Sequence, residues 1–104
     1  MSFPEHESPA VESYVRLQVL GMHLRAHRFT IHHVAGGLVV RNMTPTARSR
    51  YGAGEVPSDT ITCRPREEDG GRYWYYTSWQ QSIAEAERIT DALVMIKGYL
   101  GVPG

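Results

Sequence analysis

The sequence predicts an α+β domain in which two helices enclose four β-strands, in the order α-β-β-β-β-α. Both ends carry apolar residues at helical spacing, and the segments between them alternate polar and apolar residues around glycine-rich turns. The 104 residues, 41% of them hydrophobic, suit one globular domain. We therefore expect a four-stranded antiparallel sheet with both terminal helices packed on one face, formed by residues 8–101 after a flexible tail at 1–7.

The first helix is expected to begin at Ser8, a favourable N-cap residue, with Pro9 in the first helical position. It should end at about Arg25–His27. Leu17 and Leu20 widen its apolar stripe, which indicates burial on more than one side. The remaining apolar residues mostly follow helical spacing: Val11, Tyr14, Val15, Val19, Met22 and Leu24.

A β-hairpin should follow the first helix. Residues 29–34 alternate in polarity, Ala35-Gly36-Gly37 is a turn signal, and residues 38–42 resemble a returning strand. Residues 44–58 then form a long polar connection punctuated by proline and glycine, of a length that is commonly functional or mobile.

A second hairpin is predicted from residues 59–66 and 72–79, with a turn at Glu67–Gly71. Its last strand is dense in residues with high β-propensity. Side chains of a strand point to alternate faces, so the aromatic residues of this strand should divide between the two faces of the sheet. Trp74 and Tyr76 should lie on one face, and Tyr73, Tyr75 and Thr77 on the other.

The final helix is predicted from a capping box formed by Ser82 and Glu85. Gly101 suits the position just after its last turn. The apolar residues between them recur at helical spacing: Ile83, Ala86, Ile89, Leu93, Ile96 and Leu100.

Charge and cysteine content narrow the classes of protein. The 11 basic and 11 acidic residues balance, whereas nucleic-acid-binding domains usually have an excess of Lys and Arg. A chain without net charge has little electrostatic protection against self-association, so a dimer is permitted. The single cysteine, Cys63, excludes a multi-cysteine zinc site and favours a cytoplasmic location. No signal-peptide pattern or long apolar stretch is present, so we expect no membrane association.

Histidines and the cysteine offer two candidates for chemistry. His23 and His27 have the i, i+4 spacing that allows two imidazoles to reach one metal, and His32 or His33 lies nearby. A zinc site needs about four ligands, and no fourth is evident. Surface histidines at a helix end are the alternative. Cys63 fits a buried structural thiol better than a nucleophile, so we expect no catalytic residue, metal or cofactor.

The second hairpin offers the strongest candidate for binding. Arginine beside aromatic residues suits single-stranded nucleic acid, and equally a protein interface, where Trp, Tyr and Arg are the usual hot-spot residues. The alternative without a binding function is that half of these aromatic residues belong to the hydrophobic core and that Glu67, Glu68 and Asp69 neutralise the charge of the arginines. We expect an interface formed by Arg64, Arg66, Arg72, Tyr73, Trp74, Tyr75, Tyr76 and Trp79.

The second half of the sequence contains a pattern of residues that resembles a known family. The pattern consists of Thr62-Cys63-Arg64-Pro65-Arg66, Asp69-Gly70-Gly71-Arg72, Trp74, Thr77-Ser78-Trp79 and Ile96-Lys97-Gly98-Tyr99-Leu100. This pattern resembles a family of small, uncharacterised actinobacterial proteins of about this length. The resemblance implies a small intracellular bacterial protein and transfers no catalytic residue.

Together these features predict a non-enzymatic interaction or regulatory domain. Its expected partner is another protein or a second copy of itself, through an aromatic-rich face of the sheet. The alternative is a regulator that binds nucleic acid through the arginines and aromatic residues of the second hairpin, which the zero net charge disfavours.

Overall fold

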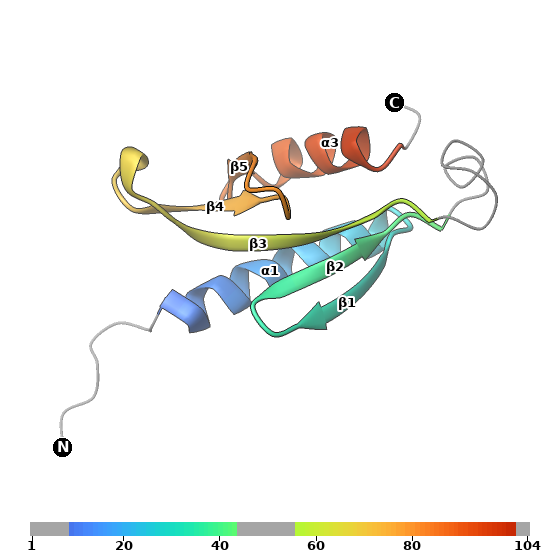
Figure 1. Cartoon of the computed structure of the whole chain (residues 1–104), viewed down its shortest axis with the longest axis horizontal. Helices are drawn as coiled ribbons and strands as arrows, with labels where there is room; N and C mark the ends of the chain where they lie inside the picture. Colours follow the sequence, from blue (N-terminus) through green and yellow to red (C-terminus); the bar gives the residue numbers. More distant parts are fainter. Residues whose placement is uncertain (1–8, 44–55, 102–104) are drawn as a thin grey trace, which may run out of the picture.

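A computed structural model describes residues 9–43 and 56–101 of the chain. The predicted tail at 1–7, the predicted N-cap Ser8 and most of the predicted connection, residues 44–55, lie outside the described residues. The described part is an α+β domain with one antiparallel sheet and two α-helices (Figure 1).

The elements follow the expected order with one additional strand. The sheet has five strands rather than four, and its spatial order β1-β2-β3-β4-β5 is the order in the sequence, so every connection joins neighbouring antiparallel strands. The elements are α1 (Pro9–Ala26), β1 (Thr30–Val34), β2 (Gly37–Arg41), β3 (Ser58–Arg66), the short 3₁₀ helix η1 (Glu67–Asp69), β4 (Arg72–Tyr76), β5 (Ser82–Glu85) and α3 (Ile89–Tyr99).

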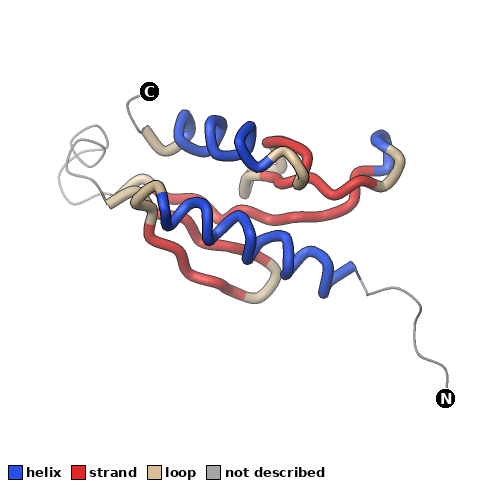
Figure 2. The backbone as a smooth tube through the Cα atoms, turned by 180° about the vertical axis from the view of Figure 1, so that it is seen from behind, coloured by secondary structure: helices blue, strands red, loops and turns tan. Residues whose placement is uncertain are grey.

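One hydrophobic core joins both helices to the sheet. The register places Leu38 opposite Ile61 and Cys63 opposite Tyr75, so these side chains share one face. Leu17, Leu20 and Leu24 of α1 and Ala92, Leu93 and Ile96 of α3 are buried in the same cluster. Helix α1 passes behind β2 and β3 in Figure 1 and in front of the strands in Figure 2, where the view is reversed.

The predicted capping box is wrong, because Ser82–Glu85 is the edge strand β5. Its residues pair with β4, with Ala84 opposite Tyr75. The helix begins only at Ile89, and Arg88 in the N-cap position makes no side-chain capping hydrogen bond. A fifth strand gives the backbone of β4 a second hydrogen-bonded neighbour, which a buried strand requires.

The other predicted elements agree closely with the structure. Helix α1 ends at Ala26, and both hairpins form with the predicted strands, although β4 ends at Tyr76 rather than Trp79. The turn glycines Gly36, Gly70 and Gly71 have positive φ angles of 74°, 66° and 82°. Residues with a side chain rarely adopt this conformation, which explains why glycine occupies these turns. Neither α1 nor α3 combines the length and hydropathy that a membrane-spanning helix needs.

Candidate interaction surface

Two guanidinium groups cover two aromatic rings on the sheet face opposite the core. In the register, Arg64 lies opposite Trp74, and both alternate with core residues. The guanidinium carbon of Arg64 lies 3.9 Å from the ring centroid of Tyr76, and that of Arg66 lies 4.7 Å from the ring centroid of Trp74. Both distances fall within the range of cation–π attraction. We call Arg64, Arg66, Trp74 and Tyr76 the Arg–aromatic face.

Side chains around the Arg–aromatic face hold it in place. The indole Nε1 of Trp74 donates a hydrogen bond to Asp69 Oδ2 at 2.8 Å, and Arg66 Nε donates to Glu68 Oε2 at 3.2 Å. Arg64 Nη1 donates to Gln80 Oε1. The turn Glu67–Gly71 therefore fixes one end of this face, and the turn after β4 fixes the other.

These contacts also reduce the positive charge of the hairpin. Glu68 faces Arg66, and Arg72 Nη1 lies 3.9 Å from Glu85 Oε1. Arg64 differs from its neighbours because its hydrogen-bonding partner, Gln80, is neutral. The surface is therefore mixed in charge, with Arg64 as the arginine that has a neutral partner.

The structure separates the eight predicted interface residues by face and by burial. Tyr75 is completely buried in the core, and Tyr73 lies on the same side, half-buried under the Arg16 guanidinium at 5.2 Å. Tyr76 is on the opposite face but only 6% exposed. Trp79 is 58% exposed, and its ring meets that of Tyr99 edge to face, with 5.6 Å between the centroids. The predicted division of the aromatic residues between two faces is thus confirmed for Tyr73–Tyr76.

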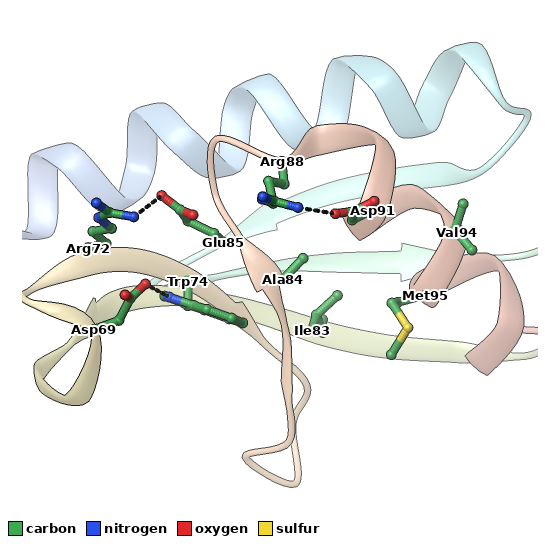
Figure 3. A pocket seen from close by; sticks show the side chains of 10 residues that line it. All are labelled: Asp69, Arg72, Trp74, Ile83, Ala84, Glu85, Arg88, Asp91, Val94 and Met95. Carbon is green, nitrogen blue, oxygen red and sulfur yellow. Dashed lines mark hydrogen bonds and ion pairs between the residues drawn. The ribbon is translucent and has the colours of Figure 1, made fainter.

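A cavity of about 570 Å³ adjoins the Arg–aromatic face (Figure 3). Its apolar lining comes from three elements: Trp74 of β4, Ile83 and Ala84 of β5, and Val94 and Met95 of α3. The ion pairs Arg72–Glu85 and Arg88–Asp91 stand at its rim. Pockets with an apolar lining and a few polar groups are typical binding sites.

Sequence patterns do not predict this cavity, because the unpredicted strand β5 forms one of its walls. When residues 82–85 are assigned to a helix, nothing brings Trp74 beside Val94 and Met95. The one available signal was the exposed pair of apolar residues in the last helix, since Val94 and Met95 do not belong to its predicted apolar stripe.

Cys63 and Tyr75 are neighbouring buried groups without the features of a catalytic pair. Burial raises the pKa of the Cys63 thiol from 9.0 to about 12, with Arg16 opposing this effect and Glu12 adding to it. Burial also raises the pKa of the Tyr75 hydroxyl, and the Cys63 charge adds to it. The Tyr75 hydroxyl donates to the backbone oxygen of Arg16 at 2.8 Å. A raised thiol pKa leaves little thiolate, so this environment suits a structural cysteine.

The four histidines that the structure describes do not assemble into a metal site. His23, His27 and His32 are exposed, and the His33 ring lies tilted by 49° against the Tyr14 ring, with 5.7 Å between the centroids. Within residues 9–43 and 56–101, no group of three or more His, Cys, Asp or Glu side chains is arranged to hold a metal ion.

The comparisons with known proteins do not identify a family for this chain. The chain matches no protein-family model, no curated protein and no solved structure. The resemblance to actinobacterial proteins therefore stays a prediction.

Proposed function

We propose that this protein is an interaction module that binds another protein through the Arg–aromatic face and the adjoining cavity. The observation that carries the proposal is the position of Trp74. Its ring lies under Arg66 and also lines the cavity. An interface centred there would combine a hot-spot residue pair with a pocket for an apolar side chain of the partner.

Two features favour a protein over a nucleic acid. Single-stranded nucleic acid binds by stacking bases on aromatic rings, but guanidinium groups already lie over the rings of Trp74 and Tyr76. The acidic residues Glu68, Asp69 and Glu85 also surround the arginines, which lowers the attraction for phosphate. A protein partner can present one apolar side chain to the cavity and polar groups to Arg64.

The test places a photo-cross-linking amino acid at position 94, in the cavity, and at position 30 as the control. Both Thr30 and Val94 are exposed, but only Val94 lines the cavity, and Thr30 lies in β1, at the opposite edge of the sheet from β5. In cells that natively produce the protein, position 94 should form an adduct with one discrete protein, and position 30 should not. Equal labelling from both positions would contradict the proposal, and an adduct with a second copy or with nucleic acid would replace it.

Two variants then test whether the labelled surface is the proposed one. Met95→Trp fills the cavity, and Thr90→Trp makes the same change outside it. Arg64→Glu reverses the charge beside Tyr76, and Arg41→Glu does so at an exposed residue of β2. Met95→Trp and Arg64→Glu should each reduce the adduct at position 94 about tenfold, as expected for hot-spot contacts, while the controls retain it.

The nucleic-acid alternative has its own measurement. Fluorescent single-stranded and duplex oligonucleotides are titrated at low and high salt. Phosphate contacts would give binding that weakens steeply with salt, with a slope that Arg64→Glu reduces. We expect no such binding.

A further inference from the structure

Helix α1 carries an apolar stripe on the side that faces away from the core. The described chain exposes ten large apolar side chains, and five of them belong to α1, so they are concentrated rather than scattered. Val11, Val15, Val19 and Met22 are 46%, 41%, 41% and 72% exposed. We call these four residues the α1 stripe. Concentrated apolar patches of this kind mark interaction sites.

Spacing places the four residues on one side of the helix. Steps of four, four and three residues keep them close to one line along the helix axis. Leu17, Leu20 and Leu24 occupy the opposite side and are buried against the sheet. In Figure 2 the helix lies in front of the strands, and the exposed fractions of the four side chains show that the described part of the chain leaves its outer side uncovered.

The α1 stripe complements itself when the helix is reversed. If two copies of α1 pack antiparallel with their midpoints near Leu17, Val11 meets Met22 of the second copy and Val15 meets Val19 of the second copy. The same arrangement places Glu12 beside His23 of the second copy. The first turn of α1 is acidic at Glu12 and its last turn is basic at His23 and Arg25, so reversal brings opposite ends together.

We propose that this protein forms a twofold symmetric dimer through the α1 stripe, with the two α1 helices antiparallel. A parallel pair would instead bring the two acidic first turns to one end of the interface and the two basic last turns to the other. The chain has no net charge to oppose association. Twofold dimers use the same patch on both copies, which is the property this stripe has.

This dimer and the proposed partner site use different surfaces. The α1 stripe lies on the outer side of the helix that covers the core, whereas the Arg–aromatic face is on the opposite side of the sheet. A dimer would therefore present two Arg–aromatic faces to partners at once. A failure of either proposal leaves the other standing.

The first test is the mass of the protein in solution, measured by light scattering after size exclusion at ~100 µM, because a single helix pair is a small interface. The wild type should have twice the 11.7 kDa mass of one chain. Val15→Glu and Val19→Glu should each give the monomer mass. Val94→Glu, which adds the same charge at an exposed valine of α3, should remain a dimer.

Each variant is also checked by thermal unfolding, since a loss of fold would change mass for another reason. All three substituted valines are more than one third exposed, so the monomer fold should be retained. A wild type that is monomeric, or a dimer that Val94→Glu disrupts and Val19→Glu leaves intact, would overturn the proposal.

Disulfide cross-linking tests the direction of the helices. Val11→Cys and Met22→Cys proteins are oxidised separately and as a mixture. Antiparallel packing predicts a disulfide between unlike chains in the mixture and little in either protein alone, because positions 11 and 22 are ~16 Å apart along one helix. Cross-linking between like chains only would mean a parallel pair. The wild type is the control for Cys63, which is buried.

Discussion

The side-chain amide of Asn42, at the end of β2, donates a hydrogen bond to the backbone oxygen of Leu100, at the end of α3, over 3.0 Å. The backbone N–H of Asn42 donates to Pro57 O at 2.8 Å. Asn42 is only 1% exposed. One buried residue therefore joins the ends of β2 and α3 to the start of β3, and satisfies a helix-end carbonyl that has no partner within its own helix.

Asn42→Ala should lower the free energy of unfolding by about 1–3 kcal/mol, since it leaves the Leu100 carbonyl buried without this donor. Urea unfolding followed by circular dichroism measures the change. Gln18→Ala removes an exposed amide that donates to the Tyr14 hydroxyl, and it should change stability by less than ~0.5 kcal/mol. If the two substitutions lowered the free energy of unfolding equally, the buried Asn42–Leu100 hydrogen bond would contribute no more to stability than the exposed Gln18–Tyr14 bond.

Cys63 and Tyr75 predict a loss of stability at alkaline pH. The pKa of Cys63 is about 12 in the folded protein and near 9.0 when unfolded, so only the unfolded state releases the proton between these values. The free energy of unfolding should therefore fall as pH rises above 9, by up to ~1.4 kcal/mol per pH unit for each such group. The raised pKa of Tyr75 acts in the same direction, but only above the ordinary tyrosine pKa of 10.0.

Urea unfolding from pH 7 to 11 measures this slope, with Cys63→Ala as the comparison. The variant is less stable at neutral pH because a buried side chain is truncated, but its stability should fall less steeply above pH 9. The thiol should also react slowly with a disulfide reagent at pH 8 in the folded protein and quickly in urea. Fast labelling of the folded protein would contradict the buried, neutral thiol.

Two glycines predict opposite effects of the same substitution. In α3, an added Cβ at Gly98 would meet no atom within 4 Å, so Gly98→Ala should stabilise the protein by ~0.5–1 kcal/mol through helix propensity. At Gly37, in β2, the added Cβ would come within 2.9 Å of Thr60 Cγ2 and 3.3 Å of the Ile61 oxygen. Gly37→Ala should therefore lower the melting temperature, and thermal unfolding of the two variants gives the sign of each change.

Local signals predicted most of the fold because they agree with tertiary packing in these segments. Proline at the start of α1, glycines at the turns and alternation in β3 and β4 act within a few residues. The prediction of a helix start at Ser82–Glu85 was wrong because Ser and Glu three residues apart are compatible with a capping box and also with a polar edge strand. Pairing with β4 decides between them, and that partner is a tertiary property of Trp74–Tyr76.

The candidate surface was predictable only in part for the same reason. Alternation along β4 predicts that Trp74 and Tyr76 share a face, and it predicts that Tyr73 and Tyr75 share the other. It does not predict that Arg64 and Arg66 lie over the rings, since that depends on the register of β3 against β4. The cavity beside Trp74 depends in addition on β5 and α3.

The stacking of Arg66 on Trp74 predicts a measurable coupling between the two side chains. Arg66→Ala, Trp74→Leu and the double variant form a cycle in which the coupling should be ~0.5–1 kcal/mol, as for exposed cation–π pairs. The exposed ion pair Arg88–Asp91 provides the control cycle, with a coupling nearer zero that salt removes. The Arg66–Glu68 ion pair is also screened by salt, so unfolding is compared at low and high ionic strength. A coupling that persists at high salt would show that the contact between Arg66 and the Trp74 ring is stabilising. A coupling that disappears at high salt would mean that the ion pair with Glu68 alone holds Arg66 in place.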